Sequence, residues 1–309
     1  MKKAALALVF VAGGALALPA PRLPGPARAD YTRSDREAED ARCVKCHAQK
    51  AREHAASLHR ASFEDATFQR AYAIDHEAFC RSCHAPEARP DAEPDAFARS
   101  HGVACVTCHV PEPGGAVLAS RESPKAPHAV RRVEGFGTAS CARCHEFTFP
   151  GGDEKMQRTM SEHAASAARD RSCASCHMKE GSHAFPASRD ADLLARSVEV
   201  EARRDGSEVS FTLRARDVGH AMPTGDLFRR LVLRVQTRRG VVERPFARTF
   251  RGHTETNDTR LAPERRVVLD VPDGPIAWSL VHQRVISARQ APPYDVTVDG
   301  ETPLAQGAL

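Results

Sequence analysis

The motif Cys-x-x-Cys-His occurs five times in this chain, and the five copies together use all ten cysteines. No cysteine is therefore left for a structural disulfide or a separate thiol site. In this motif both thiols bond covalently to a porphyrin and the histidine binds its iron, so the pattern predicts c-type haem. Zinc knuckles also use paired cysteines, but zinc gives no reason for a histidine directly after each second cysteine.

We therefore expect five covalently bound haem c groups, each attached by two cysteines and ligated by one histidine. In chain order these residues are Cys43, Cys46 and His47; Cys80, Cys83 and His84; Cys105, Cys108 and His109; Cys141, Cys144 and His145; and Cys173, Cys176 and His177.

The N-terminus has the pattern of a cleaved secretory signal. Lys2 and Lys3 precede an apolar run over residues 4–18, and Ala27-Arg28-Ala29 has the form of a cleavage site. The run is short for a transmembrane helix, and no later stretch is apolar enough to span a bilayer. We expect a signal peptide over residues 1–29 and an exported protein, periplasmic in a bacterium, with no stable membrane insertion.

The formal net charge of +4 belongs to the predicted signal peptide. Its basic residues are Lys2, Lys3, Arg22 and Arg28, so the remaining chain is formally neutral. Haem propionates would make the loaded protein acidic. A nucleic-acid partner needs a basic footprint, so none is expected.

Composition divides the remaining chain in two. Residues 41–183 hold every cysteine, and a chain that carries so many motifs is too thin to bury an ordinary side-chain core. We expect haems to form the core of a mostly helical or loop domain over residues 30–192. From residue 194 onward Val, Leu and Phe alternate with polar residues, which predicts a small antiparallel β-sandwich over residues 193–309. The expected fold class is α+β.

Several elements can be placed more closely. Helices are expected over Ala48–Ala61, Phe63–Ile74 and Glu154–Arg169, with mostly loop between residues 86 and 137. The expected strands are Ser197–Ala202, residues 209–215, residues 231–235, Val241–Phe250, Arg266–Val271 and Ile276–Ile286.

A haem iron with two protein ligands is closed and carries electrons, whereas one with a single ligand can bind a small molecule. Ten histidines lie outside the motifs, and five are the stronger candidates for second, distal ligands. They lie on expected helices (His59 and His163), in a proline-bounded loop (His128), shortly after the last motif (His183) and in a turn between strands (His220).

The other histidines and the methionines remain alternatives. His76 and His101 shortly precede motifs and could be either ligands or partners of propionates. Surface or strand positions are expected for His54, His253 and His282. Methionine could replace histidine as an axial ligand, and the candidates are Met156, Met160, Met178 and Met222.

Several segments resemble a group of exported multihaem cytochromes c with a C-terminal β-domain. The resemblance covers most of the chain after the signal, and it implies electron transfer through stacked haems, often without a defined substrate. It also implies that His183 and His220 are distal ligands. The segments that carry it are residues 79–88, residues 141–147, Cys-Ala-Ser-Cys-His-Met at 173–178, Ser-His-Ala-Phe-Pro at 182–186 and Gly-His-Ala-Met-Pro-Thr-Gly at 219–225.

The expected function is electron transfer through five haems, mostly with two histidine ligands. The redox partner would be another cytochrome or a membrane quinol oxidoreductase, to which the β-domain could dock. The alternative is a reductase or oxidoreductase with one open haem that acts on a small nitrogen or sulfur oxyanion. Multihaem nitrite reductases replace one motif histidine by lysine, and hydroxylamine-oxidising enzymes use a haem-bonded tyrosine. Here all five motifs end in histidine, and Tyr31, Tyr72 and Tyr294 lie in no recognisable setting. A non-enzymatic carrier is therefore favoured, with the enzyme left open.

Overall fold

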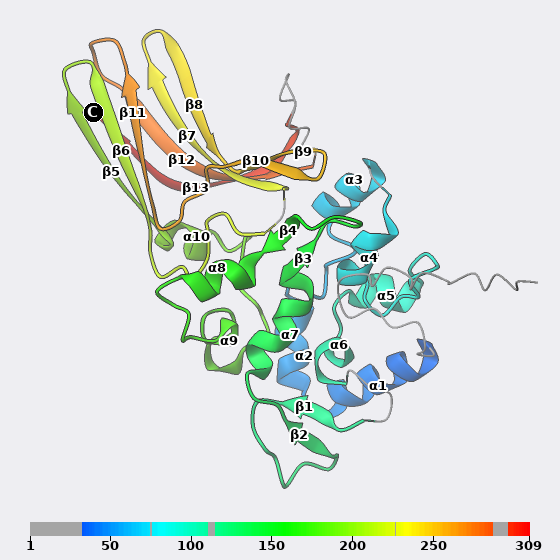
Figure 1. The fold of residues 1–309 in the computed structure, drawn as a ribbon. Helices are drawn as coiled ribbons and strands as arrows, with labels where there is room; N and C mark the ends of the chain where they lie inside the picture. The colour runs from blue at the N-terminus through cyan, green and yellow to red at the C-terminus, as the bar shows by residue number, and fades with distance from the viewer. Residues whose placement is uncertain (1–32, 75, 111–114, 226, 287–295) are drawn as a thin grey trace, which may run out of the picture.

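The computed structural model describes residues 33–309 except 75, 111–114, 226 and 287–295. The expected signal peptide lies outside these residues. Helices dominate the first part of the described chain and strands the second, in a mixed α and β fold with several small antiparallel sheets (Figure 1). None of the described helices is long and apolar enough to cross a membrane.

The helices are short, as expected for a chain interrupted by closely spaced motifs. They are α1 (Arg33–Cys46), α2 (Ala48–Ala55), α3 (Ala66–Ile74), α4 (Ala78–His84), α5 (Ala96–His101), α6 (Cys105–His109), α7 (Phe136–His145), α8 (Thr159–Ala165), α9 (Cys173–His177), the 3₁₀ turn η1 (Lys179–Gly181) and α10 (Ala191–Arg196).

Two pairs of short strands interrupt the helices, and the other strands follow α10. The first four are β1 (Val117–Ala119), β2 (Val130–Arg132), β3 (Glu146–Thr148) and β4 (Lys155–Arg158). The later ones are β5 (Val198–Asp205), β6 (Glu208–Ala215), β7 (Arg229–Thr237), β8 (Gly240–Phe246), β9 (Arg248–Arg251), β10 (Thr254–Asp258), β11 (Glu264–Asp270), β12 (Ala277–Val285) and β13 (Val298–Ala308).

The strand-rich part contains a four-stranded sheet, β13-β12-β7-β8, and a three-stranded sheet, β11-β6-β5. Both are antiparallel. One hydrophobic core joins them: Val209, Phe211 and Leu213 of β6 pack in the same cluster as Leu233 and Leu280 of the larger sheet. These positions alternate along their strands because successive strand side chains point to opposite faces.

The strand predictions agree well with the structure, although the expected Val241–Phe250 strand is divided into β8 and β9. Two strands of the strand-rich part were missed. β10 and β13 are rich in polar residues and glycine and lack the apolar alternation on which the predictions relied. The expected boundary between residues 192 and 193 falls inside α10.

The helix predictions were less accurate. The Ala48–Ala61 helix ends at Ala55, and the Phe63–Ile74 helix begins at Ala66, after Asp65 accepts a bond from the Phe68 amide at 3.0 Å. The first residues of the expected Glu154–Arg169 helix form strand β4, which pairs with β3. Local spacing could not reveal this pairing. Residues 86–137 are mostly loop but contain α5, α6, β1 and β2.

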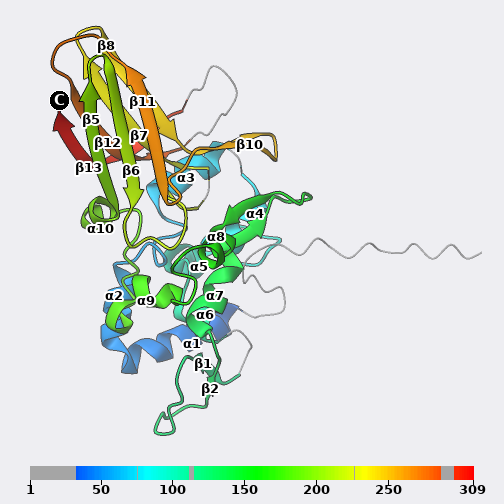
Figure 2. The same cartoon turned by 60° about the vertical axis from the view of Figure 1, so that its left-hand side comes forward.

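Charged side chains join the helical part to the strand-rich part. β9 and β10 extend over the helical part in both views (Figures 1 and 2). Arg248 donates to the carbonyls of Lys155 and Met156 at 2.6 Å. Arg158 pairs with Glu255 and Asp258, and Arg260 pairs with Glu162 of α8. Because Arg248 and Arg260 are almost fully buried, these contacts bind the two parts closely.

Candidate functional site

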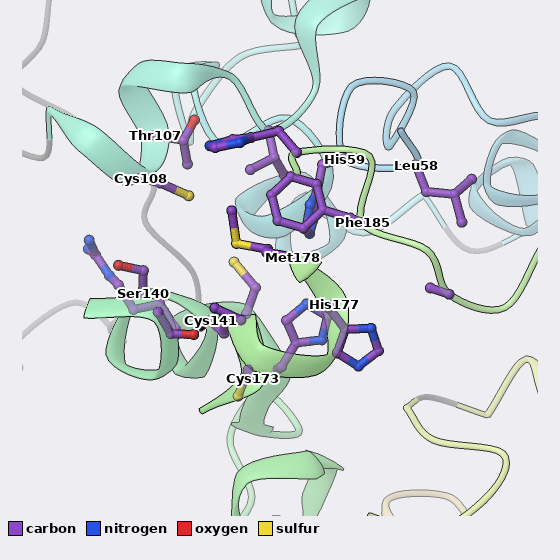
Figure 3. Close-up of a pocket in the computed structure, with 18 of the residues that line it drawn as sticks. Leu58, His59, Thr107, Cys108, Ser140, Cys141, Cys173, His177, Met178 and Phe185 are labelled. Atoms are coloured by element: carbon purple, nitrogen blue, oxygen red, sulfur yellow. Dashed lines mark hydrogen bonds between the residues drawn. The ribbon is translucent and has the colours of Figure 1, made fainter. Parts of the chain in front are cut away.

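A cavity of about 2350 Å³ runs through the helical part and reaches the strand-rich part. All the cysteines and histidines of the five motifs line it, together with His59, His128, His163, His183 and His220. Figure 3 shows one stretch of this wall, where Cys108, Cys141 and Cys173 from three motifs converge with His59 and His177. Every motif cysteine and histidine and every candidate distal histidine thus borders one cavity.

Each motif directs its three residues to one side because it is helical. α4, α7 and α9 end at His84, His145 and His177, α6 ends at His109, and α1 ends at Cys46 beside His47. In a helix, residues three and four positions apart lie on one face. Both thiols and the histidine of a motif therefore face the same side.

Four of the five motif histidines face a second histidine. The ring centroids are 6.4 Å apart for His47 and His128, and 6.3 Å apart for His59 and His145. They are 6.2 Å apart for His109 and His183, and 6.3 Å apart for His177 and His220. Each pair joins a motif histidine to one of the five candidate distal histidines.

This spacing fits a metal ion held between two imidazoles. A metal–imidazole bond is about 2 Å long, and each ring centroid lies about 1 Å behind its nitrogen, so two ligands across one ion have centroids about 6 Å apart. A bis-histidine c-type haem needs two imidazoles as iron ligands and two adjacent thiols to attach the porphyrin. The residues present therefore fit that group at four sites.

Backbone carbonyls hold several of these rings by one nitrogen. Nδ1 of His84, His109 and His177 lies 2.8, 2.7 and 2.9 Å from the carbonyls of Ser62, Leu118 and Pro186. When Nδ1 donates this bond, Nε2 is left to bind a metal, the arrangement usual for a metal-bound histidine. The candidates His183 and His220 contact the carbonyls of Gly181 and Ala221 through Nδ1 at 3.1 Å.

Burial favours the neutral form of four of the paired histidines. It lowers the pKa of His59 to about 3, an effect that the nearby His145 reinforces. Burial also lowers the pKa of His109, His183 and His220. Neutral imidazole is the form that binds a metal, so these rings are ready to act as ligands at neutral pH.

The second motif has different surroundings. The ring of Phe68 stacks on His84 with centroids 3.8 Å apart and planes 9° apart. Among the described residues, the ring of His163, the remaining candidate, contacts no motif histidine. It packs instead against Gly219, where an added side-chain carbon would lie 2.9 Å from Cδ2 of His163. The structure thus brings four of the five candidates opposite motif histidines and places His163 beside the turn that carries His220.

The five other histidines were expected to be surface or strand residues, propionate partners or further ligands, and the structure shows what each contacts. His54 contacts the carbonyl of Val103 through Nε2 at 2.8 Å, and His76 contacts Glu93 at 3.2 Å. His101 lies 3.2 Å from the carbonyl of Phe97, and His253 stacks on Phe149. His282 lies on β12, as a strand histidine was expected to, but it is buried against the cavity.

Interactions between thiols show which motifs are neighbours in space. Cys141 and Cys173 interact directly, as do Cys144 and Cys83, and these contacts raise the pKa of Cys141 and of Cys144. Weaker electrostatic interactions join Cys108 to Cys144 and Cys105 to Cys43. The motifs therefore adjoin in the order first, third and fourth, and the fourth also adjoins the second and the fifth.

No disulfide joins the ten cysteines, all of which the structure describes. Within the described ranges, no group of three or more His, Cys, Asp or Glu side chains is arranged to hold a metal ion by itself.

Comparisons with known proteins do not place the chain in a family. No family model and no curated protein matches it. Among solved structures, a hypothetical protein of Pyrococcus horikoshii OT3 is similar to 37% of this chain over 92% of its own length, with 13% identity and a TM-score of 0.19. A superoxide reductase in the oxidized state is similar to 36% of this chain over 88% of its own length, with 15% identity and a TM-score of 0.19.

Proposed function

We propose that this protein is an exported multihaem c-type cytochrome that transfers electrons through five covalently bound haems, most of them with two histidine ligands. The observation that carries the proposal is the set of four histidine pairs at 6.2–6.4 Å, each beside a Cys-x-x-Cys segment. Haem supplies reversible one-electron chemistry when bound. The chain would hold most of the irons between two rings, orient several of those rings through carbonyls and exclude water.

The proposed fold follows from the same sites. Haems would fill the large cavity and form the core of the helical part, while the two sheets of the strand-rich part would form a β-sandwich. The turn that carries His220 would then supply a ligand to the haem at His177. Docking of the sandwich would complete that site.

The contacts among the motifs indicate a route for electrons. The fourth motif, Cys141 to His145, adjoins three others and would act as a branch point. The first motif lies beyond the third, and the second and fifth each adjoin the fourth. A redox partner could therefore exchange electrons at the first, second or fifth site. A cytochrome or a membrane quinol oxidoreductase remains the proposed partner.

Haem content and spin state test the proposal. The pyridine haemochrome assay and the intact mass should give five haems per chain, and the oxidised EPR spectrum should be mainly low-spin. A Cys173→Ser, Cys176→Ser double variant should retain four haems. Zinc in place of haem, or an unchanged haem count in that variant, would contradict the proposal.

A further inference from the structure

The inner face of the four-stranded sheet ends in a group of polar side chains beside the cavity. Leu280 lies in the hydrophobic core, and His282 and Arg284 follow on the same face of β12 because alternate residues share a face. In the register of β12 with β7, His282 is opposite Leu231 and Arg284 is opposite Arg229. His282, Arg284 and Arg229 all line the cavity.

Two of these side chains have buried nitrogens without hydrogen-bond partners in the described structure. His282 is 1% exposed, and its Nδ1 has no partner. Nε of Arg284 is likewise buried and has no hydrogen-bond partner. A buried donor without a partner costs about 1–3 kcal/mol, and such groups are rare in native proteins. The described residues hold four such nitrogens, and the two on His282 and Arg284 belong to side chains that line the cavity. Their place at one wall points to a ligand there.

The charge around His282 fits an anion. Burial lowers its pKa to about 4, and the positive charges of Arg229 and Arg284 act in the same direction. At neutral pH the ring is therefore a neutral group that can donate one hydrogen bond, beside two guanidinium groups. Guanidinium pairs best with planar or tetrahedral groups that present several acceptor oxygens.

Among the described residues, the carboxylates that act on Arg284 are already bound elsewhere. Asp65 and Asp299 both act electrostatically on Arg284. However, Asp65 pairs with Arg189, and Asp299 pairs with Arg70 and accepts a bond from Thr67. These carboxylates lower the net positive charge near Arg284, but the hydrogen-bonding capacity of His282 and Arg284 remains.

The group lies near the second motif. Asp65, which acts on Arg284, caps α3 by accepting from the amide of Phe68 at 3.0 Å. Phe68 in turn stacks on His84. The start of α3 therefore connects the end of the sheet to the motif histidine whose neighbour is Phe68.

We propose that His282 and Arg284, with added positive charge from Arg229, form a binding site for an oxyanion at the wall that faces the second motif. The ligand has at least two acceptor oxygens, as a carboxylate, nitrite or sulfate does. It comes either from a propionate of the haem at His84, in which case the site rests on the proposed function, or from a free oxyanion. The experiment distinguishes these sources.

The experiment compares the oxidised wild-type holoprotein with Arg284→Gln and His282→Gln variants. Isothermal titration with sodium nitrite and with sodium sulfate measures binding of a free oxyanion, and a redox titration measures the midpoint potentials. If the ligand is a free oxyanion, the wild type binds one equivalent of the salt. Each variant then binds it at least about tenfold more weakly, because a hydrogen bond to a charged group contributes about 1.5–3 kcal/mol. If the ligand is a propionate, neither salt binds, and Arg284→Gln lowers the potential of one haem because a positive charge is lost.

Two controls keep the result specific. Arg203→Gln removes a guanidinium whose side chain is 79% exposed on β5 and should change neither quantity. The His282→Gln variant is also examined by EPR, because a new high-spin haem would show that His282 is an iron ligand and would overturn the proposal. Absence of both salt binding and any change of potential would overturn it as well. Haem content is measured on the same samples, so loss of the proposed function would be recognised separately by a haem count other than five.

Discussion

Whether an iron gains a second histidine ligand depends on how the ring of that histidine is oriented and held. A ring becomes a ligand only if one nitrogen is turned toward the metal and the other is held in place. His220 meets both conditions, since it faces His177 with planes 10° apart and contacts the Ala221 carbonyl through Nδ1. His163 lies close by, on α8, and packs on Gly219. His220 can therefore be tested by substitution, with His163 as the matched control.

We expect His220→Ala to convert one low-spin haem into a high-spin haem, about one fifth of the total iron, because the sixth ligand of one site is lost. His163→Ala should leave the proportion of low-spin haem unchanged. EPR and the optical spectrum of the oxidised protein measure both. A high-spin signal from His163→Ala and none from His220→Ala would reverse the assignment.

A buried ion pair supports the third motif. Arg36 of α1 and Glu87 form a pair in which each side chain is less than 5% exposed. Arg36 also donates to the carbonyl of Val110, and Thr107 donates to Glu87 at 2.5 Å. The pair thus connects α1 to the helix that contains Cys105 and His109.

Arg36→Ala should lower the free energy of unfolding by about 3–5 kcal/mol, because it leaves Glu87 buried without its counter-ion. The exposed pair of Arg203 and Glu201 provides the control, and Arg203→Ala should cost about 0–1 kcal/mol. Denaturant unfolding followed by circular dichroism measures both changes. Equal effects of the two substitutions would contradict this account of Arg36.

At the scale of elements, the sequence predicted those features that depend on local pattern. The apolar alternation of β5, β6, β7 and β12 is local, and these strands form where expected. The short helices at the motifs, such as α6 and α9, were not predicted. β4 was predicted as helix because only its pairing with β3 makes it a strand. His163 was chosen as a ligand from its place on a helix, but the packing of Gly219 against it depends on how α8 meets a distant turn. Such long-range contacts leave no periodic signal.

Strands β9 and β4 meet through Arg248, whose side chain is 1% exposed. Arg248→Met keeps an unbranched apolar stem but removes the guanidinium and its bonds to the Lys155 and Met156 carbonyls. We expect faster amide hydrogen exchange in β4, β9 and β10, because these segments would open locally more often. Arg251→Met, at an exposed position of the same strand, is the control and should leave exchange in β4 unchanged.

The contact between α8, β4 and β10 should weaken in acid. Burial raises the pKa of Asp258, but bonds from Arg260 and the charge of Arg158 outweigh it, and the pKa is lowered overall. A lowered folded-state pKa adds stability that is fully present above the unfolded value of about 4 and is lost as pH falls through the folded value. Asp258→Asn should therefore show a smaller loss of stability than the wild type below about pH 4, with a lower stability at pH 7. Thermal unfolding between pH 2 and 7 measures the difference, and parallel curves would contradict it.

On the scale of the whole molecule, the two parts differ in what could hold them together. The strand-rich part has a continuous core that includes Phe211, Leu233 and Leu280, each fully buried. The helical part has only small clusters around Phe63 and Val106 among its described residues, and the cavity separates its helices. Because the helical part has so few apolar contacts of its own, we expect its stability to depend on a group bound in the cavity.

The two parts should therefore behave differently when they are separated. A fragment of residues 187–309, which retains α10 and its contacts with β13 and β5, should fold without haem and unfold in one cooperative transition, because its apolar core is complete.

The helical part, residues 30–186, should be unfolded without haem. When matured with haem it should carry five haems, with one more of them high-spin than in the full chain, because His220 is absent. Adding the folded 187–309 fragment should restore the low-spin signal if docking supplies that ligand. The His220→Ala fragment is the control, because it keeps the docking surface but cannot ligate the iron. Restoration by both fragments would show that the strand-rich part acts on the fifth site by some route other than His220.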